Sequence, residues 1–176
     1  MTALVVYESM FGSTMAVAEA IAAGLRETLL VRTVEVGELA SETGGMSVDP
    51  DVRLLVVGGP THAFGMSTSA TRASATRESR ARLVSSQIGI REWLDGLRMP
   101  ARPPLVAAFD TRIDRPGMTG SAARAAQHLL ERYGSSSAVP ARSFMVQGMS
   151  GGLVEGQLGE AREWGRTLAE AVMTRD

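Results

Sequence analysis

Nearly uninterrupted runs of apolar residues recur along the chain at intervals typical of one folded domain. These runs predict strands at residues 3–8, 32–36, 53–59, 105–110 and 143–149. The first, third and fourth runs contain few polar positions, as expected for strands that are buried on both faces of a parallel sheet. A strand with one exposed face would instead alternate apolar and polar residues.

Segments with helical periodicity separate these strands. Apolar or small residues recur at helical spacing in residues 13–28, 90–99, 119–134 and 158–173, and residues 37–51 have room for one short helix. Ser13 is a candidate N-cap of the first helix. The alternation of strands and helices predicts a doubly wound α/β fold, with residues 1–176 forming a single domain. Residues 65–89 interrupt the alternation, and their Ser, Thr, Ala and Arg content predicts a long surface loop that is partly helical.

The composition excludes several kinds of chemistry. The chain has no cysteine and no lysine, so it has no disulfide, no iron–sulfur cluster, no Schiff-base lysine and no lysine-containing P-loop. A net charge of −1 gives no general attraction to nucleic acid or anionic membranes. No apolar run has the length of a membrane span, and the first residues do not resemble a signal peptide, so we expect a cytoplasmic protein. The two histidines, His62 and His128, lack neighbouring ligands, and we predict neither a metal site nor a catalytic side chain.

Two turns that follow predicted strands carry the residues that could bind a ligand. The first, "ESMFGST" at 8–14, has one glycine and therefore is not a dinucleotide-binding fingerprint. Its hydroxyls and the free N–H groups of a helix start can hold a phosphate without a basic side chain, or they can form an ordinary helix cap. In the second, "GGPTHAFG" at 58–65, paired glycines permit a close backbone approach, and His62 and Phe64 can cover a flat ring. The alternative is a tight turn with a partly buried Phe.

Taken together, the two turns resemble loops of the flavodoxin family. "ESMFGST" is similar to the family's phosphate loop, [ST]-x-[TYWF]-G-x-T, especially as it occurs in flavodiiron proteins. "GGPTHAFG" is similar to the second loop of the family, G-x-P-T followed by an aromatic residue and Gly. The resemblance implies a five-stranded parallel sheet in order 2-1-3-4-5, a three-layer sandwich and bound FMN. Carried over by position, the cofactor-binding residues are Ser9, Met10, Phe11, Gly12, Ser13, Thr14, Pro60, Thr61, His62, Ala63, Phe64, Gly65, Phe109, Asp110, Thr111 and Arg112.

The resemblance implies an electron carrier that works with a redox partner, which the sequence does not identify. An alternative is an oxidoreductase of the same fold acting on a quinone or protoporphyrinogen, with residues 65–89 as its substrate lid or docking site. A second alternative is an interaction module that has lost FMN. The arginines of the 65–89 segment (72, 77, 80 and 82) have two open interpretations. They could form a docking site, either for an acidic partner or for an anionic group of a substrate, or they could form a solvated face.

The loop after the fourth strand departs from the family pattern. "FDTRIDRPGMTG" at 109–120 lacks the usual Tyr or Trp, so His62, Phe64 or Phe109 must stack on the ring. Arg112 is expected either near flavin N1/O2, where its charge would raise the reduction potential, or at the surface beside an aspartate. In the first case the protein is a weaker reductant than a typical flavodoxin.

Overall fold

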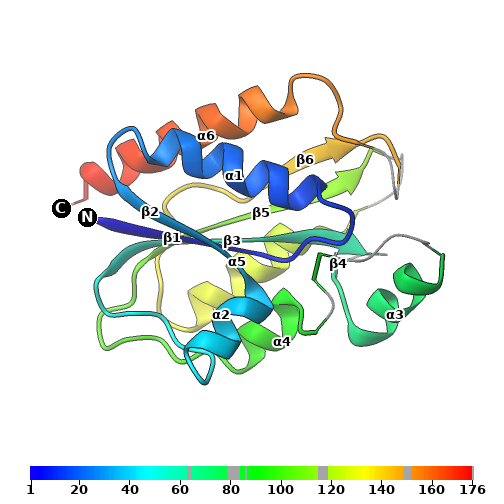
Figure 1. The fold of residues 1–176 in the computed structure, drawn as a ribbon. Coiled ribbons are helices and arrows are strands. Elements are labelled where there is room, and N and C mark those ends of the chain that lie inside the picture. The colour runs from blue at the N-terminus through cyan, green and yellow to red at the C-terminus, as the bar shows by residue number, and fades with distance from the viewer. Residues whose placement is uncertain (63–64, 79–83, 86, 115–118, 149–151, 176) are drawn as a thin grey trace.

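A computed structural model shows a central parallel sheet between two layers of helices (Figure 1). The structure describes residues 1–62, 65–78, 84–85, 87–114, 119–148 and 152–175. The five long strands lie in the order β2-β1-β3-β5-β6, and all four pairings between them are parallel. Their bounds are Thr2–Tyr7 for β1, Leu30–Glu35 for β2, Val52–His62 for β3, Leu105–Ile113 for β5 and Arg142–Val146 for β6.

This order confirms the predicted flavodoxin-like arrangement of the long strands. One additional strand, β4 (Gly65–Met66), was not predicted and pairs antiparallel with the last two residues of β3. It is too short to leave a periodic signal in the sequence. Within the described residues the sheet therefore has six strands, whereas five were predicted.

Helices cover both faces of the sheet. One face carries α1 (Ser13–Leu25) and α6 (Gln157–Met173), whereas the other carries α2 (Val36–Glu42), α4 (Ile90–Asp95) and α5 (Ala122–Arg132) (Figure 1). The remaining helix, α3 (Ser69–Glu78), lies beyond the end of the sheet near β4. The predicted partial helicity of the 65–89 segment is thus confirmed. No helix in the described ranges is both long enough and apolar enough to cross a membrane.

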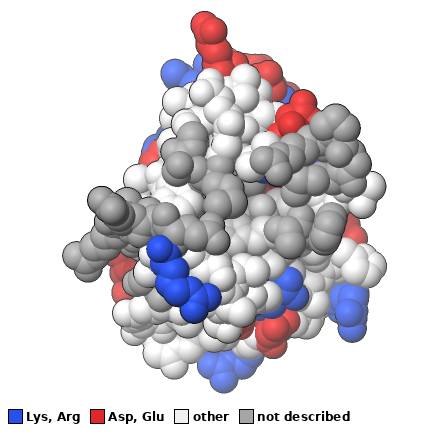
Figure 2. Space-filling model, turned by 90° about the vertical axis from the view of Figure 1, so that its right-hand side faces the viewer, with Lys and Arg blue, Asp and Glu red and all other residues white. Residues whose placement is uncertain are grey.

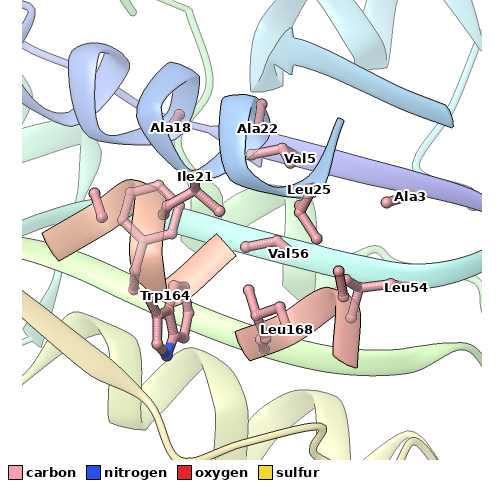
Figure 3. Close-up of a cluster of buried hydrophobic side chains, with 14 of the residues drawn as sticks. Ala3, Val5, Ala18, Ile21, Ala22, Leu25, Leu54, Val56, Trp164 and Leu168 are labelled. Atoms are coloured by element: carbon pink, nitrogen blue, oxygen red, sulfur yellow. The ribbon is translucent and has the colours of Figure 1, made fainter. Parts of the chain in front are cut away.

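The sheet is buried on both faces, which explains the continuous apolar runs. Along β1, Ala3 and Val5 face the α1/α6 side, whereas Leu4 and Val6 face the other helical layer. Figure 3 shows the core on the α1/α6 side, where Ile21, Leu25, Trp164 and Leu168 surround Val5, Leu54 and Val56. Alternating positions of one strand therefore contribute to two separate cores.

Two glycines allow α1 and α6 to pack in close contact. A Cβ atom on Gly165 would lie 2.2 Å from the carbonyl oxygen of Ile21, and one on Gly24 would lie 2.1 Å from that of Arg162. Any larger side chain would force the helices apart. This pairing fixes the axis of α1, and with it the position of the loop that precedes α1.

Candidate functional site

Residues 9–14 lead from the end of β1 into the first turn of α1 at the carboxyl edge of the sheet, and we call them the first loop. Gly12 has a φ of 96° and precedes the helix as its N-cap, and its carbonyl accepts a hydrogen bond from Ala16 N at 2.9 Å. The expectation that Ser13 caps the helix was wrong, since Ser13 is the first helical residue. A left-handed backbone at the cap favours glycine, so the single glycine of the loop stands where the turn requires one.

The buried hydroxyl of Ser9 organises this loop. Ser9 Oγ accepts hydrogen bonds from Gly12 N at 3.1 Å and from Met15 N at 3.3 Å. The backbone N–H groups of Ser13 and Thr14 have no acceptor among the described residues. These N–H groups and the positive end of the α1 dipole form a binding site for an anion. The hydrogen bonds that the described residues make to the loop involve no basic side chain.

A pair of hydroxyl groups joins the first loop to strand β5. Thr14 Oγ1 lies 2.7 Å from Thr111 Oγ1, and both residues are buried. Thr111 was assigned to a loop under the cofactor ring, but β5 continues to Ile113 and Thr111 lies within the strand. The strand continues because Gly58, Gly59 and Pro60 remain paired with 109–111.

Asp110 is fully buried and links β3 to helix α5. Its Oδ2 accepts hydrogen bonds from Thr61 Oγ1 at 2.8 Å, Ser121 Oγ at 2.6 Å and Ala123 N at 3.0 Å. Thr61 Oγ1 in turn accepts from Ala122 N at 2.9 Å. The carboxylate therefore caps α5 and fixes the end of β3. The described structure gives Asp110 this supporting role.

Phe109 lies in the core and cannot stack on a ligand ring. It is 1% exposed and packs edge-on against Phe144, with ring centroids 6.3 Å apart. A Cβ atom on Gly58 would lie 2.0 Å from the Phe109 ring. Gly58 is therefore required by the packing of Phe109, and the expectation that Phe109 supplies a stacking surface was wrong.

The remaining expected site residues lie around the same edge of the sheet. Pro60, Thr61 and His62 end β3, and Gly65 begins β4; Ala63 and Phe64 lie outside the described residues. Burial, followed by the positive charge of Arg72, lowers the pKa of His62 below its ordinary value, so the imidazole is neutral at neutral pH. His62 is thus the one described residue of the three expected stacking candidates that lies at the edge of the sheet.

Arg112 and Phe11 have different surroundings. Arg112 Nη1 donates a hydrogen bond to the carbonyl of Gly120 at 3.0 Å, ahead of helix α5. Phe11 is half-buried and packs against the buried Met10. Both residues lie in elements that reach the candidate site, and neither placement tests their expected contact with a cofactor.

A buried charged cluster that the sequence did not reveal lies directly before the first loop. Glu8 is 1% exposed; its Oε1 accepts a hydrogen bond from the Ser67 hydroxyl, and its Oε2 accepts one from Ile90 N at 2.8 Å. Arg72 Nη1 lies 3.9 Å from Glu8 Oε1, and Arg72 Nη2 lies 2.8 Å from Glu92 Oε1. The only sequence signal was a glutamate directly after a buried strand.

This cluster corrects one interpretation of the arginine-rich segment. Arg72 is 6% exposed and pairs with acidic residues, so it belongs neither to a solvated face nor to an accessible docking patch. Arg77 is exposed, whereas Arg80 and Arg82 lie outside the described residues. Figure 2 shows the face at the carboxyl edge, where charged side chains of the described surface are scattered without a continuous patch of one sign.

The pKa values of the two carboxyl groups of the cluster, Glu8 and Glu92, are shifted in opposite directions. Burial raises the pKa of Glu8, although hydrogen bonds from Ser67 and Ile90 act in the other direction. Burial also acts to raise the pKa of Glu92, but hydrogen bonds from Arg72 and from the backbone outweigh it and lower the pKa. The difference follows the geometry, because the guanidinium lies closer to Glu92 than to Glu8.

Comparison with known proteins supports the same family. The sequence model of the flavodoxin family, described as "Flavodoxin", matches residues 5–87. No curated protein matches the chain. The match begins within β1 and includes the first loop, β3 and β4, which are the elements that carry the two loop patterns.

Solved structures share the fold over almost the whole chain. A flavodoxin from Archaea is 20% identical, with a TM-score of 0.61 and 98% of this chain and 99% of that one covered. Flavodoxin 2 from Bacillus cereus is 16% identical, with a TM-score of 0.66 and coverage of 97% and 99%. A flavodiiron core from Synechocystis is 16% identical, with a TM-score of 0.63; all of this chain matches 37% of that one. The predicted flavodoxin resemblance is confirmed, and the fold is flavodoxin-like.

Proposed function

We propose that the protein binds FMN and carries electrons between partner proteins. The observation that carries the proposal is the first loop, where the Ser9 hydroxyl holds a turn ahead of the N–H groups of Ser13 and Thr14, for which the described residues provide no acceptor. Such a loop suits a phosphate group, and the family match points to a flavin mononucleotide as its source. Bound FMN would supply one- and two-electron redox chemistry.

The residues present fit the phosphate end of this cofactor. Neutral donors and a helix dipole would compensate the phosphate charge, and Gly12 supplies the backbone conformation that the turn needs. The end of β3, at Pro60 to His62, would lie beside the ring, with Asp110 fixing Thr61 in place. The protein would bind and orient the cofactor, and no side chain of the described site is assigned a catalytic role.

The carrier role is favoured over an enzyme with a substrate lid. The lid interpretation rested on the long 65–89 segment, and the described parts of that segment are joined to the body of the protein. Arg91, for example, donates hydrogen bonds to the carbonyl oxygens of Ser67 at 3.1 Å and Met66 at 2.8 Å. A carrier fits the expected cytoplasmic location and would need an external reductase and acceptor.

The proposal is tested by the absorption spectrum of the purified protein and by assays of its reduction and of electron transfer from it. We expect flavin absorption from a dissociable FMN, reduction only when a flavin reductase is added, and electron transfer to an acceptor such as cytochrome c. Turnover of a quinone with NAD(P)H, or of protoporphyrinogen with menaquinone, by the isolated protein would favour the enzyme. Failure to bind flavin even after reconstitution would favour an interaction module and overturn the proposal.

A further inference from the structure

Val84 and Ser85, near the end of the 65–89 segment, lie against the first loop, and Ser85 makes reciprocal hydrogen bonds with it. Ser85 N donates to the carbonyl of Ser9 at 2.8 Å, and Ser9 N donates to the hydroxyl of Ser85 at 3.0 Å. One residue earlier, Val84 N donates to the carbonyl of Met10 at 3.1 Å. Both backbone polar groups of Ser9 are therefore held by a residue that is distant in sequence.

The Ser85 hydroxyl is itself fixed in orientation. It is buried and donates a hydrogen bond to Glu35 Oε1 at 2.6 Å. Because a hydroxyl has a single proton, this donation leaves a lone pair directed to Ser9 N. The other carboxylate oxygen of Glu35 accepts from Gly37 N at 2.8 Å and Glu38 N at 3.0 Å, so the carboxylate is held at the start of α2.

Ser9 passes this constraint to the anion-binding turn. The Ser9 hydroxyl is the shared acceptor for Gly12 N and Met15 N, on either side of the unpaired N–H groups of the loop. A rotation of the Ser9 peptide would move this acceptor and the turn built around it. A chain of hydrogen bonds thus runs from Glu35 through Ser85 and Ser9 to Gly12.

We propose that Ser85 is a positioning residue for the phosphate-binding loop and that Val84 and Ser85 belong to the cofactor site. The inference rests on the proposed function, because it assumes that the first loop binds the FMN phosphate. Ser85 acts through Ser9 and has no assigned contact with the ring. Its loss should therefore weaken the contribution of the phosphate to binding and leave binding of the ring unchanged.

Riboflavin, which lacks the phosphate, separates this role from a general structural one. The experiment measures dissociation constants of FMN and riboflavin for the wild-type protein, Ser85→Ala, and the pair Ser85→Thr and Ser85→Val. Thr and Val are similar in size, and only Thr keeps the hydroxyl. Ser74→Ala, in the outer helix α3 of the same segment, is the matched control.

We expect Ser85→Ala and Ser85→Val to bind FMN about tenfold more weakly, roughly the effect of one lost hydrogen bond. Riboflavin affinity should stay within about twofold in every variant, and Ser85→Thr and Ser74→Ala should bind FMN like the wild type. Because riboflavin binding also reports folding, a variant that loses both ligands equally would show a structural role and overturn the inference. An unchanged FMN affinity would overturn it as well. A wild-type protein that binds both ligands equally would refute the phosphate site itself, and with it the inference.

Discussion

Arg72 Nη1 lies 3.9 Å from Glu8 Oε1, in an ion pair whose side chains are 7% and 1% exposed. Glu8 directly precedes the first loop, and Arg72 belongs to α3. This pair joins helix α3, in the first half of the 65–89 segment, to the residue before the first loop. Ser85, near the end of the same segment, contacts Ser9 of that loop. The positive charge of Arg72 is therefore paired with acidic side chains within the protein.

Replacing Arg72 with methionine should destabilise the protein strongly. Arg72→Met would leave the Glu8 carboxylate buried without a cationic partner, and breaking a buried pair on one side costs about 3–5 kcal/mol. Arg77→Met is the matched control, because Arg77 is exposed in the same helix and should cost less than about 0.5 kcal/mol. Urea denaturation measures both values, and equal effects of the two substitutions would contradict the buried pair.

Removing the ionisable group of Glu8 should change how stability depends on pH. Burial raises the pKa of Glu8 in the folded protein above its ordinary value of 4.5. The folded form therefore binds this proton more tightly than the unfolded form, and the contribution of Glu8 to stability is lost as the pH rises through its folded pKa. Because glutamine does not titrate, the Glu8→Gln variant does not lose stability in this way as the pH rises.

Urea denaturation of both proteins between about pH 4 and about pH 8 tests this expectation. The stability of Glu8→Gln relative to the wild type should increase with pH above 4.5. Glu92, whose pKa is lowered, contributes in the opposite direction and is present in both proteins. A difference between the two proteins that is constant over this range would show that the pKa of Glu8 is not raised.

The close packing of α1 and α6 gives a prediction about stability alone. Gly165→Ala would place a Cβ 2.2 Å from the backbone oxygen of Ile21, so the helices must separate at a cost of about 1–3 kcal/mol. Gly159→Ala is the control in the same helix, since nothing lies within 4 Å of its added Cβ. Gly159→Ala should be neutral or stabilising because alanine favours helix. Thermal unfolding that ranks the two variants in the reverse order would contradict the observed packing.

A substitution at Arg112 tests the expected tuning of the cofactor. If the guanidinium stabilises the negative charge of reduced flavin, Arg112→Gln should lower the midpoint potential of bound FMN. Arg124→Gln is the control, because Arg124 is an exposed arginine that donates to the carbonyl of Thr119 nearby. A redox titration in which both variants match the wild type would show that Arg112 does not tune the potential of the flavin.

The sequence predicted the fold well because the fold depends on patterns that are local to each element. Strands buried on both faces, such as β1, produce continuous apolar runs, and helices such as α5 carry their own cap residue, Ser121. The strand order was predicted through the family resemblance of the first and second loops.

The site was predicted less completely because several of its contacts join residues that are distant in sequence. No local pattern pairs Glu8 with Arg72 or Ser9 with Ser85, since both pairs form only when the 65–89 segment folds back. Phe109 was misassigned for a related reason. Its apolar character suited both a stacking role and the core, and only the register of β5 against β3 places it over Gly58.

The first loop is proposed to be a phosphate site built from neutral donors. The most direct test compares the dissociation constants of FMN and riboflavin for the wild-type apoprotein, both measured by flavin fluorescence. We expect FMN to bind at least about 100-fold more tightly, which corresponds to about 2.7 kcal/mol from the phosphate contacts. Equal affinities for the two flavins, or no binding of either, would contradict the account.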